Sequence, residues 1–260
     1  MNFSKISNRT FYGKILRLPL KLIPKRMVVP IVRGPLRGKR WIVGASTHGC
    51  WLGSYEYQKQ SIFKKTVKSG YVVYDIGAHV GFYTLLSSVL VGTQGKVIAF
   101  EPVQRNLEYL KKHVEINSCN NVEILPYAVS DNMGIKRFSF SINPSMGHLC
   151  EDGEIEVQVV TVDEIFRFRN IPCPNIVKID VEGAEYGVLR GAEHTIRQHR
   201  PVLFLSTHGP DIHRNCCAML QAMSYHLAGL NDTSFELMDE IIAIPLSIES
   251  TKQNQPDYVK

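Results

Sequence analysis

Apolar residues follow two spacings in turn from residue 70 onward. Short apolar runs have the length of buried strands: "YVVYDIG", "KVIAFEP", "VEILPYAVSD", "NIVKID" and "PVLFLST". Longer stretches between them place apolar residues three or four positions apart, which predicts helices: "GFYTLLSSVLVG", "VQRNLEYLKKHVEIN" and "EYGVLRGAEHTIRQH". Gly92 and Gly95 end the first helix, and Pro102 suits the first turn of the second. Strands that alternate with helices predict a parallel sheet with right-handed crossovers.

The middle and the end of the chain depart from this order. "IKRFSFSI" and "EIEVQVVTV" each alternate apolar and polar residues, which predicts an inserted antiparallel hairpin around "NPSMGHLCEDG". Thr161 and Glu164 have the spacing of a capping box and open a short helix. "DIHRNCCAMLQAMS" predicts the last helix, and "YHLAGL" and "EIIAIP" two closing strands. We therefore expect seven strands in the main sheet, with the last pair antiparallel.

Charge divides the chain more clearly than hydrophobicity does. The 260 residues are 44% hydrophobic, which suits one large α/β domain with an appended segment. No acid precedes Glu56, whereas eleven Lys and Arg do, so residues 56–260 carry 19 basic and 24 acidic residues, or −5. We predict a basic extension over 1–55, packed on or near the active site, and a domain over 56–260. Leucines between the lysines suit an anionic membrane surface or an anionic, lipid-linked acceptor, or simply packing on the domain.

The remaining composition indicates a cytoplasmic protein, with peripheral contact at the inner face of the membrane as the one alternative. No apolar run reaches the roughly 20 residues that span a bilayer. The N-terminus lacks the continuous apolar segment of a signal peptide. The six cysteines form no CxxC pair, which favours reduced thiols over a zinc site or a disulfide framework.

The first strand ends in the loop Asp75-x-Gly77-x-x-x-Gly81. Glycines there let the backbone pass close to a ligand. The spacing differs from the GxGxxG of dinucleotide folds, and an acid at this place disfavours a bound phosphate. Asp75 instead suits a cation. S-adenosylmethionine carries a sulfonium and an amine and no phosphate, so it fits this loop better than NAD does.

Two further acids follow the next two strands. Glu101 ends the second strand, where a carboxylate accepts both ribose hydroxyls of a nucleoside. Asp131 follows the third strand, where an acid accepts from the adenine amino group. Three successive strand ends with an acid therefore follow the length of one adenosyl ligand. The alternative is that these acids only cap helices.

These motifs resemble the FkbM family of S-adenosylmethionine-dependent methyltransferases. The resemblance covers roughly residues 34–206, and its most specific element is "KIDVEGAE". It implies a class I, Rossmann-like sheet ordered 3-2-1-4-5-7-6, and O-methylation of sugars or polyketide hydroxyls. Asp75, Gly77 and Gly81 would then line the methionine part. The full set of expected cofactor-binding residues is Asp75, Gly77, Ala78, His79, Gly81, Glu101, Pro102, Asn106, Asp131 and Asp180.

The acceptor site is expected beyond the fourth and fifth strands, with Asp180, Glu182, Glu185 and His208 as the candidate catalytic residues. His208 is the best base near neutral pH, unless it is only a satisfied loop residue. Many members of the family that the chain resembles have an acid near Ser206, where this chain has Ser206-Thr-His208. The glutamates open a helix, and stabilising its dipole is their alternative role. The spacing matches no closed metal site, so no metal is predicted. Tyr55 and Glu56 either cover the pocket or dock the extension.

The sequence thus predicts an S-adenosylmethionine-dependent methyltransferase acting on a hydroxyl of a sugar, glycoconjugate or polyketide-like acceptor. One alternative is a non-catalytic adenosyl-binding protein anchored by its basic extension, and another is an NAD-dependent oxidoreductase. No nucleic-acid partner is expected, since the chain lacks an Asn-Pro-Pro-Tyr-like motif and its basic residues concentrate in the extension.

Overall fold

The computed structural model describes residues 20, 22–140, 147–149, 152–229, 236 and 238–246. The chain forms two compact units, which we describe separately. Unit 1 comprises Met1–Tyr71 and Ala78–Pro126, and unit 2 comprises Val72–Gly77 and Tyr127–Lys260. Among the described residues, no helix has both the length and the apolar character needed to cross a membrane.

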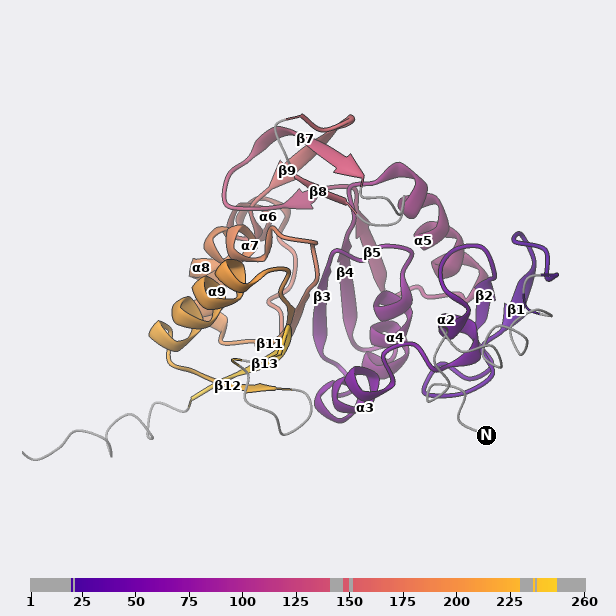
Figure 1. Ribbon diagram of the computed structural model, residues 1–260. Helices are drawn as coiled ribbons and strands as arrows, with labels where there is room; N and C mark the ends of the chain where they lie inside the picture. The colour runs from indigo at the N-terminus through magenta and orange to yellow at the C-terminus, as the bar shows by residue number, and fades with distance from the viewer. Residues whose placement is uncertain are drawn as a thin grey trace, which may run out of the picture. The chain divides into compact units, whose positions relative to one another are not determined.

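Seven strands make one mixed sheet, as predicted. Unit 2 contributes five of them in the order β12-β13-β11-β10-β3, and unit 1 contributes the parallel pair β4 and β5 (Figure 1). β3, β10 and β11 run parallel, whereas β13 is antiparallel to both β11 and β12, which confirms the closing antiparallel pair. The bounds are β3 Val72–Ile76, β4 Lys96–Phe100, β5 Val122–Leu125, β10 Ile176–Ile179, β11 Val202–Ser206, β12 Tyr225–Gly229 and β13 Glu240–Pro245.

Unit 1 surrounds its two sheet strands with helices and a short hairpin. Its other elements are β1 Val28–Pro30, β2 Arg40–Ile42, α2 His48–Leu52, α3 Tyr57–Thr66, α4 Phe82–Val91 and α5 Gln104–Ile116. Gly92 ends α4, as predicted. α5 begins at Gln104, so Pro102 precedes the N-cap residue and does not lie in the first turn. The apolar face of α5 places Leu107 and Leu110 in a buried cluster with Ala99 of β4.

The described part of the N-terminal extension docks on α5 through one buried histidine. The Trp41 ring stacks on His113 with a centroid distance of 3.9 Å and an angle of 15°. The backbone N–H of Ile42 donates to Nε2 of His113 at 3.0 Å, which leaves Nδ1 as the donor to the Val80 carbonyl at 2.8 Å. Burial lowers the pKa of His113 to about 4, so the ring is neutral at physiological pH. The predicted boundary at residue 55 stays a prediction.

The helices of unit 2 include a break that the sequence did not predict. Its helices are α6 Val162–Arg169, α7 Glu185–Gly191, α8 Glu193–His199 and α9 Pro210–Ala222. The single helix expected over 185–199 is wrong, because Ala192 leaves the helical region and separates α7 from α8. Two glycines let α7 approach another segment closely. A Cβ on Gly191 would lie 2.0 Å from the Ser130 carbonyl oxygen, and one on Gly187 would lie 2.7 Å from the Ser130 hydroxyl.

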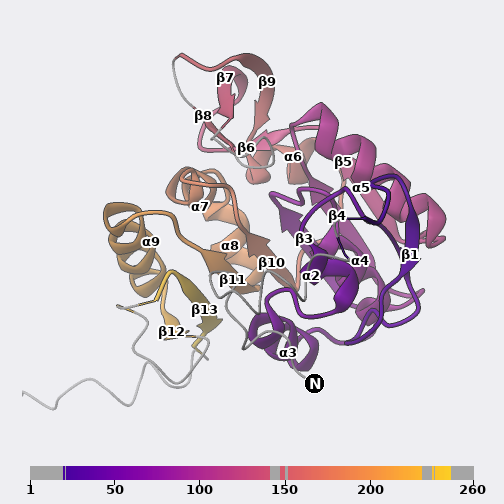
Figure 2. The same ribbon diagram turned by 45° about the vertical axis from the view of Figure 1, so that its right-hand side comes forward.

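A second, four-stranded sheet in unit 2 has the order β6-β9-β7-β8 (Figure 2). Its bounds are β6 Ala128–Val129, β7 Gly134–Phe140, β8 Gly147–Leu149 and β9 Ile155–Val160. The predicted antiparallel pairing of the two alternating segments is confirmed for β7 and β9. The third strand expected over 122–131 is instead split after β5, and Pro126, which has no N–H, lies between the two pieces. Most of the insertion between β7 and β9 lies outside the described residues.

Thr161 begins α6 as the sequence predicts. Its hydroxyl oxygen accepts the backbone N–H of Glu164 at 3.1 Å and donates to the Glu164 carboxylate at 2.8 Å. This pairing satisfies one free N–H of the first helical turn.

Candidate active site

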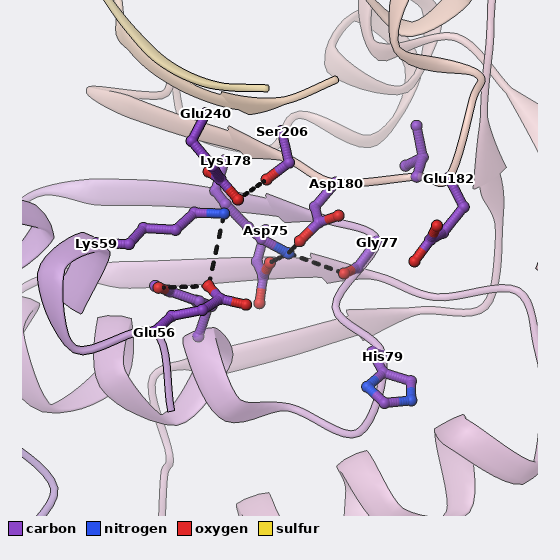
Figure 3. Close-up of polar contacts among 12 residues, drawn as sticks. Glu56, Lys59, Asp75, Gly77, His79, Lys178, Asp180, Glu182, Ser206 and Glu240 are labelled. Atoms are coloured by element: carbon purple, nitrogen blue, oxygen red, sulfur yellow. Dashed lines mark hydrogen bonds and ion pairs between the residues drawn. The ribbon is translucent and has the colours of Figure 1, made fainter. Parts of the chain in front are cut away.

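A buried lysine organises the ends of β3 and β10. Parallel pairing sets Lys178 directly opposite Asp75, and the two residues are 4% and 0% exposed. The Lys178 ammonium lies 3.1 Å from Asp75 Oδ1, donates to the Gly77 carbonyl at 2.9 Å and lies 3.8 Å from Asp180 Oδ2 (Figure 3). The sequence argument missed this residue, although a lysine inside an apolar strand is itself a signal, because buried lysines need partners. The cofactor contact assigned to Asp75 stays a prediction.

The two loop glycines lie close to other parts of the chain, and the close approach of a ligand stays a prediction. Gly77 and Gly81 have φ of 76° and 93°, a region that side chains disfavour. A Cβ on Gly77 would lie 1.9 Å from the Asp180 carbonyl oxygen, and one on Gly81 would lie 2.5 Å from Leu110 Cδ1. Close approach of protein atoms is thus sufficient to require both glycines.

Glu101 is the centre of the predicted cofactor residues in unit 1. Its carboxylate is 4% exposed and accepts the backbone N–H of His79 at 2.8 Å and that of Val103 at 2.9 Å. The Asn106 amide donates to it at 3.2 Å. A carboxylate offers about four lone-pair positions, and at least three of them already have donors. The ribose contact assigned to Glu101 stays a prediction.

Asp131 lies in unit 2 and already faces two cations. Its carboxylate is 3.4 Å from Arg190 and 3.7 Å from Lys136. It borders a cavity of about 250 Å³, whose other lining residues are Asn132, Met133, Thr161, Asp163, Glu164, Arg190 and Gly191. The cavity is smaller than the roughly 300–1,000 Å³ of drug-sized ligand sites. The adenine contact assigned to Asp131 stays a prediction.

The four predicted catalytic residues come together in unit 2. Asp180 follows β10 and His208 follows β11, two neighbouring parallel strands whose carboxyl ends share one edge. His208 Nε2 lies 3.3 Å from Glu182 Oε2 and 4.0 Å from Asp180 Oδ1. On the other side of the ring, Nδ1 lies 2.7 Å from Glu185 Oε1. Three carboxylates therefore surround one imidazole.

The loop between β10 and α7 gives this cluster its geometry. Glu182 and Gly183 both have positive φ, 55° and 108°, and the chain turns sharply there. Glu185, the first residue of α7, is 0% exposed and accepts the backbone N–H groups of Gly183 at 3.0 Å and Val181 at 3.4 Å. Its Oε2 is buried with no hydrogen-bond partner among the described residues. Glu185 thus fixes both the loop and the His208 ring.

The surrounding carboxylates determine the charge of His208. The hydrogen bond with Glu185, aided by the charges of Glu185, Glu182 and Asp180 and opposed by burial, raises the pKa of His208 to about 9. The ring is then protonated at neutral pH. The expectation that His208 acts as the base stays a prediction.

The end of the extension docks within unit 1. The Tyr55 ring lies against Phe82 with a centroid distance of 5.0 Å, and Glu56 accepts from the Tyr83 hydroxyl at 2.9 Å. Lys59 forms an ion pair with Glu56 at 3.6 Å. These contacts dock the end of the extension onto the rest of unit 1, which is one of the two roles expected for Tyr55 and Glu56. The other role, covering a pocket, stays a prediction.

Comparison with known proteins gives a matching family domain and two similar relatives. The methyltransferase FkbM domain matches residues 75–243. The hexuronic acid methyltransferase AglP of Haloferax volcanii is 28% identical over 130 residues, which are 48% of this chain and 52% of that protein. The 31-O-demethyl-FK506 methyltransferase FkbM of Streptomyces tacrolimicus is 27% identical over 162 residues, 49% of this chain and 61% of that protein. The chain thus matches only about half to three-fifths of these relatives' lengths.

Among solved structures, the methyltransferase FkbM from Methylobacillus flagellatus KT is similar, with a TM-score of 0.50 and 18% sequence identity. The similarity covers 67% of this chain and 43% of that one. At this identity the comparison speaks for the fold alone. It confirms the predicted fold class, a class I methyltransferase-like α/β sheet.

Proposed function

The chain belongs to the methyltransferase FkbM family, and from this premise we propose that it is an S-adenosylmethionine-dependent O-methyltransferase. Its acceptor is a hydroxyl group of a sugar, glycoconjugate or polyketide-like molecule. The names of the two relatives, a hexuronic acid methyltransferase and a demethyl-FK506 methyltransferase, support these two acceptor classes. Their partial coverage makes the activity and the acceptor a proposal for this chain.

The observation that carries the proposal is the cluster at the carboxyl ends of β10 and β11. Parallel α/β sheets bind their ligands beyond this edge. Asp180, Glu182 and His208 have side chains that are 24%, 30% and 35% exposed, so they are accessible to a small molecule. We assign the acceptor hydroxyl to these three side chains.

The residues of each unit fit parts of the cofactor differently. Glu101 is oriented by two backbone N–H groups and is suited to a ribose hydroxyl. Asp75 is fully buried and paired with Lys178, so we assign it to holding the glycine loop in place. When bound, S-adenosylmethionine supplies a methyl group on a sulfonium, which is a strong leaving group. The chain must mainly align the acceptor and help remove its proton.

The basic extension supports an anionic acceptor. Eleven Lys and Arg and no acid precede Glu56, which favours a uronic acid or a lipid-linked glycan over a neutral molecule. The same charge supports peripheral contact of this cytoplasmic enzyme with an anionic membrane surface.

Calorimetric titration with S-adenosylhomocysteine, with NAD in parallel, tests the cofactor. We expect micromolar binding of the first and none of the second. Glu101→Ala should weaken binding at least tenfold, whereas Glu108→Ala, which removes an exposed glutamate of α5, should not. Heat from NAD alone would overturn the proposal in favour of an oxidoreductase.

A methyl-transfer assay with labelled S-adenosylmethionine tests the reaction. Hexuronic acid glycans and demethylated macrolides serve as acceptors. We expect Asp180→Asn to lower turnover by about 10²-fold or more, as for loss of an aligning group, with little change in S-adenosylhomocysteine binding. A protein that binds the cofactor and both acceptors without any turnover would be a non-catalytic binding protein.

A further inference from the structure

We propose that Asp180, Glu182 and His208 form a binding site for a divalent first-row transition cation such as Mn²⁺. The three side chains each turn one ligand atom toward a common point, and these atoms all lie within 4.8 Å of one another. The role of that cation, which is to orient the acceptor hydroxyl, rests on the proposed methyl transfer. The binding of the cation does not.

The distances suit one bound ion. Two ligand atoms that are each about 2.1 Å from a cation lie roughly 3.0 to 3.4 Å apart at right or tetrahedral angles. His208 Nε2 and Glu182 Oε2 are 3.3 Å apart, which is within this range. His208 Nε2 and Asp180 Oδ1 are 4.0 Å apart, and all three ligand atoms lie within 4.8 Å of one another, so the Asp180 carboxylate must move closer when an ion binds.

Glu185 has the position of a residue that supports a metal-binding histidine. Such histidines generally donate their second ring N–H to a carboxylate or carbonyl, which fixes the ring orientation. Here Nδ1 of His208 faces Glu185 Oε1 at 2.7 Å, and this directs Nε2 toward the other two carboxylates. Glu185 is itself held by the Gly183 and Val181 N–H groups, so the support is rigid. A histidine that merely neutralises surface acids needs no such buried partner.

The chemistry of the ligands selects the cation. Imidazole suits zinc, iron and their neighbours, whereas carboxylates suit magnesium, calcium and manganese. One imidazole with two carboxylates therefore accepts Mn²⁺ and Zn²⁺ ahead of Mg²⁺ or Ca²⁺, and Mn²⁺, which binds more weakly than Zn²⁺ at such ligands, is the more stringent probe of the site. Three protein ligands leave coordination positions open, which is the pattern of catalytic sites and not of closed structural ones. All three side chains are also partly exposed, so an acceptor oxygen can reach the open positions.

Mn²⁺ titration of the full chain after chelation and dialysis tests the site, with free Mn²⁺ followed by its paramagnetic resonance signal. We expect one site per chain in the absence of cofactor and acceptor. Asp180→Asn, Glu182→Gln and His208→Gln should each weaken Mn²⁺ binding at least tenfold. Glu156→Gln and His226→Gln change an exposed acid and an exposed histidine of the same unit and should leave the affinity within twofold.

Glu185→Gln tests the supporting role, since it keeps the shape of the side chain and removes its charge. Loss of such a partner typically weakens metal binding 10- to 100-fold. Circular dichroism establishes that each variant is folded, and Glu182→Gln, at a partly exposed position, keeps the test available if Glu185→Gln does not fold. Millimolar or weaker Mn²⁺ and Zn²⁺ binding by the folded wild type would overturn the proposal and leave an ion pair only. Equal affinity in the wild type and the three ligand variants would overturn it as well.

These measurements test the proposed metal site and the proposed methyl transfer separately. S-adenosylhomocysteine binding is measured in chelator, and Mn²⁺ binding is measured without the cofactor. Mn²⁺ binding without any transfer to the acceptors would overturn only the proposed reaction. Transfer that persists unchanged in chelator would overturn the role of the cation.

Discussion

His113 and His208 are both held at each ring nitrogen, yet the structure gives them opposite charges. His113 in unit 1 lies between a backbone N–H and a backbone carbonyl, under the Trp41 ring, and its pKa is lowered to about 4. His208 in unit 2 lies among three carboxylates, and its pKa is raised to about 9. The partners, more than the side chain, decide the outcome.

The difference teaches how to separate a structural histidine from a functional one. His113 is fully buried and its neutral partners need no charge, so it serves as a joint between the N-terminal segment and α5. His208 is about one-third exposed and faces three carboxylates, one of which, Asp180, also lies 3.8 Å from the Lys178 ammonium. A ligand from the solvent can therefore reach the His208 ring, whereas the His113 ring is closed to it.

The largest effect on stability is expected from removing His113, which links the N-terminal segment to α5. His113→Ala leaves a cavity under Trp41 and removes the partner of the partly buried Ile42 N–H, so the free energy of unfolding should fall by about 3 to 5 kcal/mol. Urea denaturation followed by circular dichroism measures this change. His226→Ala, at an exposed position, is the control and should change stability by under about 0.5 kcal/mol. Similar small effects in both variants would contradict the structural role of His113.

The pH dependence of stability tests the charge of the same ring. The pKa of His113 is about 4 in the folded state and about 6.5 when unfolded, so the unfolded chain binds the extra proton between these values. Stability should therefore be complete above pH 6.5 and fall by about 3 kcal/mol as the pH drops to 4. His113→Gln should remove this part of the slope, whereas His226→Gln should not. An unchanged acid slope in His113→Gln would show that His113 is not held neutral.

The smallest effect on stability is expected from Asn117, at the exposed part of the contact between the N-terminal segment and α5. Asn117 exchanges two hydrogen bonds with the backbone of Arg40, at 2.7 Å and 2.9 Å, in a solvent-exposed position. Water replaces such bonds readily, so Asn117→Ala should cost only about 1 kcal/mol. Asn132→Ala, which removes an exposed side-chain hydrogen bond elsewhere, is the comparison. A loss as large as that of His113→Ala would mean that burial is not what distinguishes the two positions.

Much of the fold could be predicted from the sequence, because strands β3, β4, β10 and β11 are apolar runs with clear ends. The break at Ala192 was not predicted; it follows Gly191, where α7 lies too close to Ser130 for any side chain. The split after β5 depends on a second sheet whose pairings join segments far apart in the chain. Pro126 is a local signal of that split, but the partner of β6 is set by tertiary contacts.

The residues of the candidate site could be predicted from the sequence, whereas the contacts that they make could not. Strand ends pointed to Asp75, Asp180 and His208, since parallel strands bring such positions to one edge. Which acid is buried against Lys178 and which remains accessible depends on side-chain directions that only the fold fixes. The charge of His208 likewise depends on Glu185, whose carboxylate reaches the ring from the start of the next helix.

The tight packing of α7 also means that a substitution at one end of the helix can displace a residue at its other end. Gly191 has no chemistry of its own, but any side chain there must push the helix away from Ser130. The same rigid helix carries Glu185 at its other end, six residues away, so the displacement would reach His208 as a misaimed ring. A geneticist would then record a loss of function at a residue remote from every reacting atom. Such a variant would be folded and abundant but inactive.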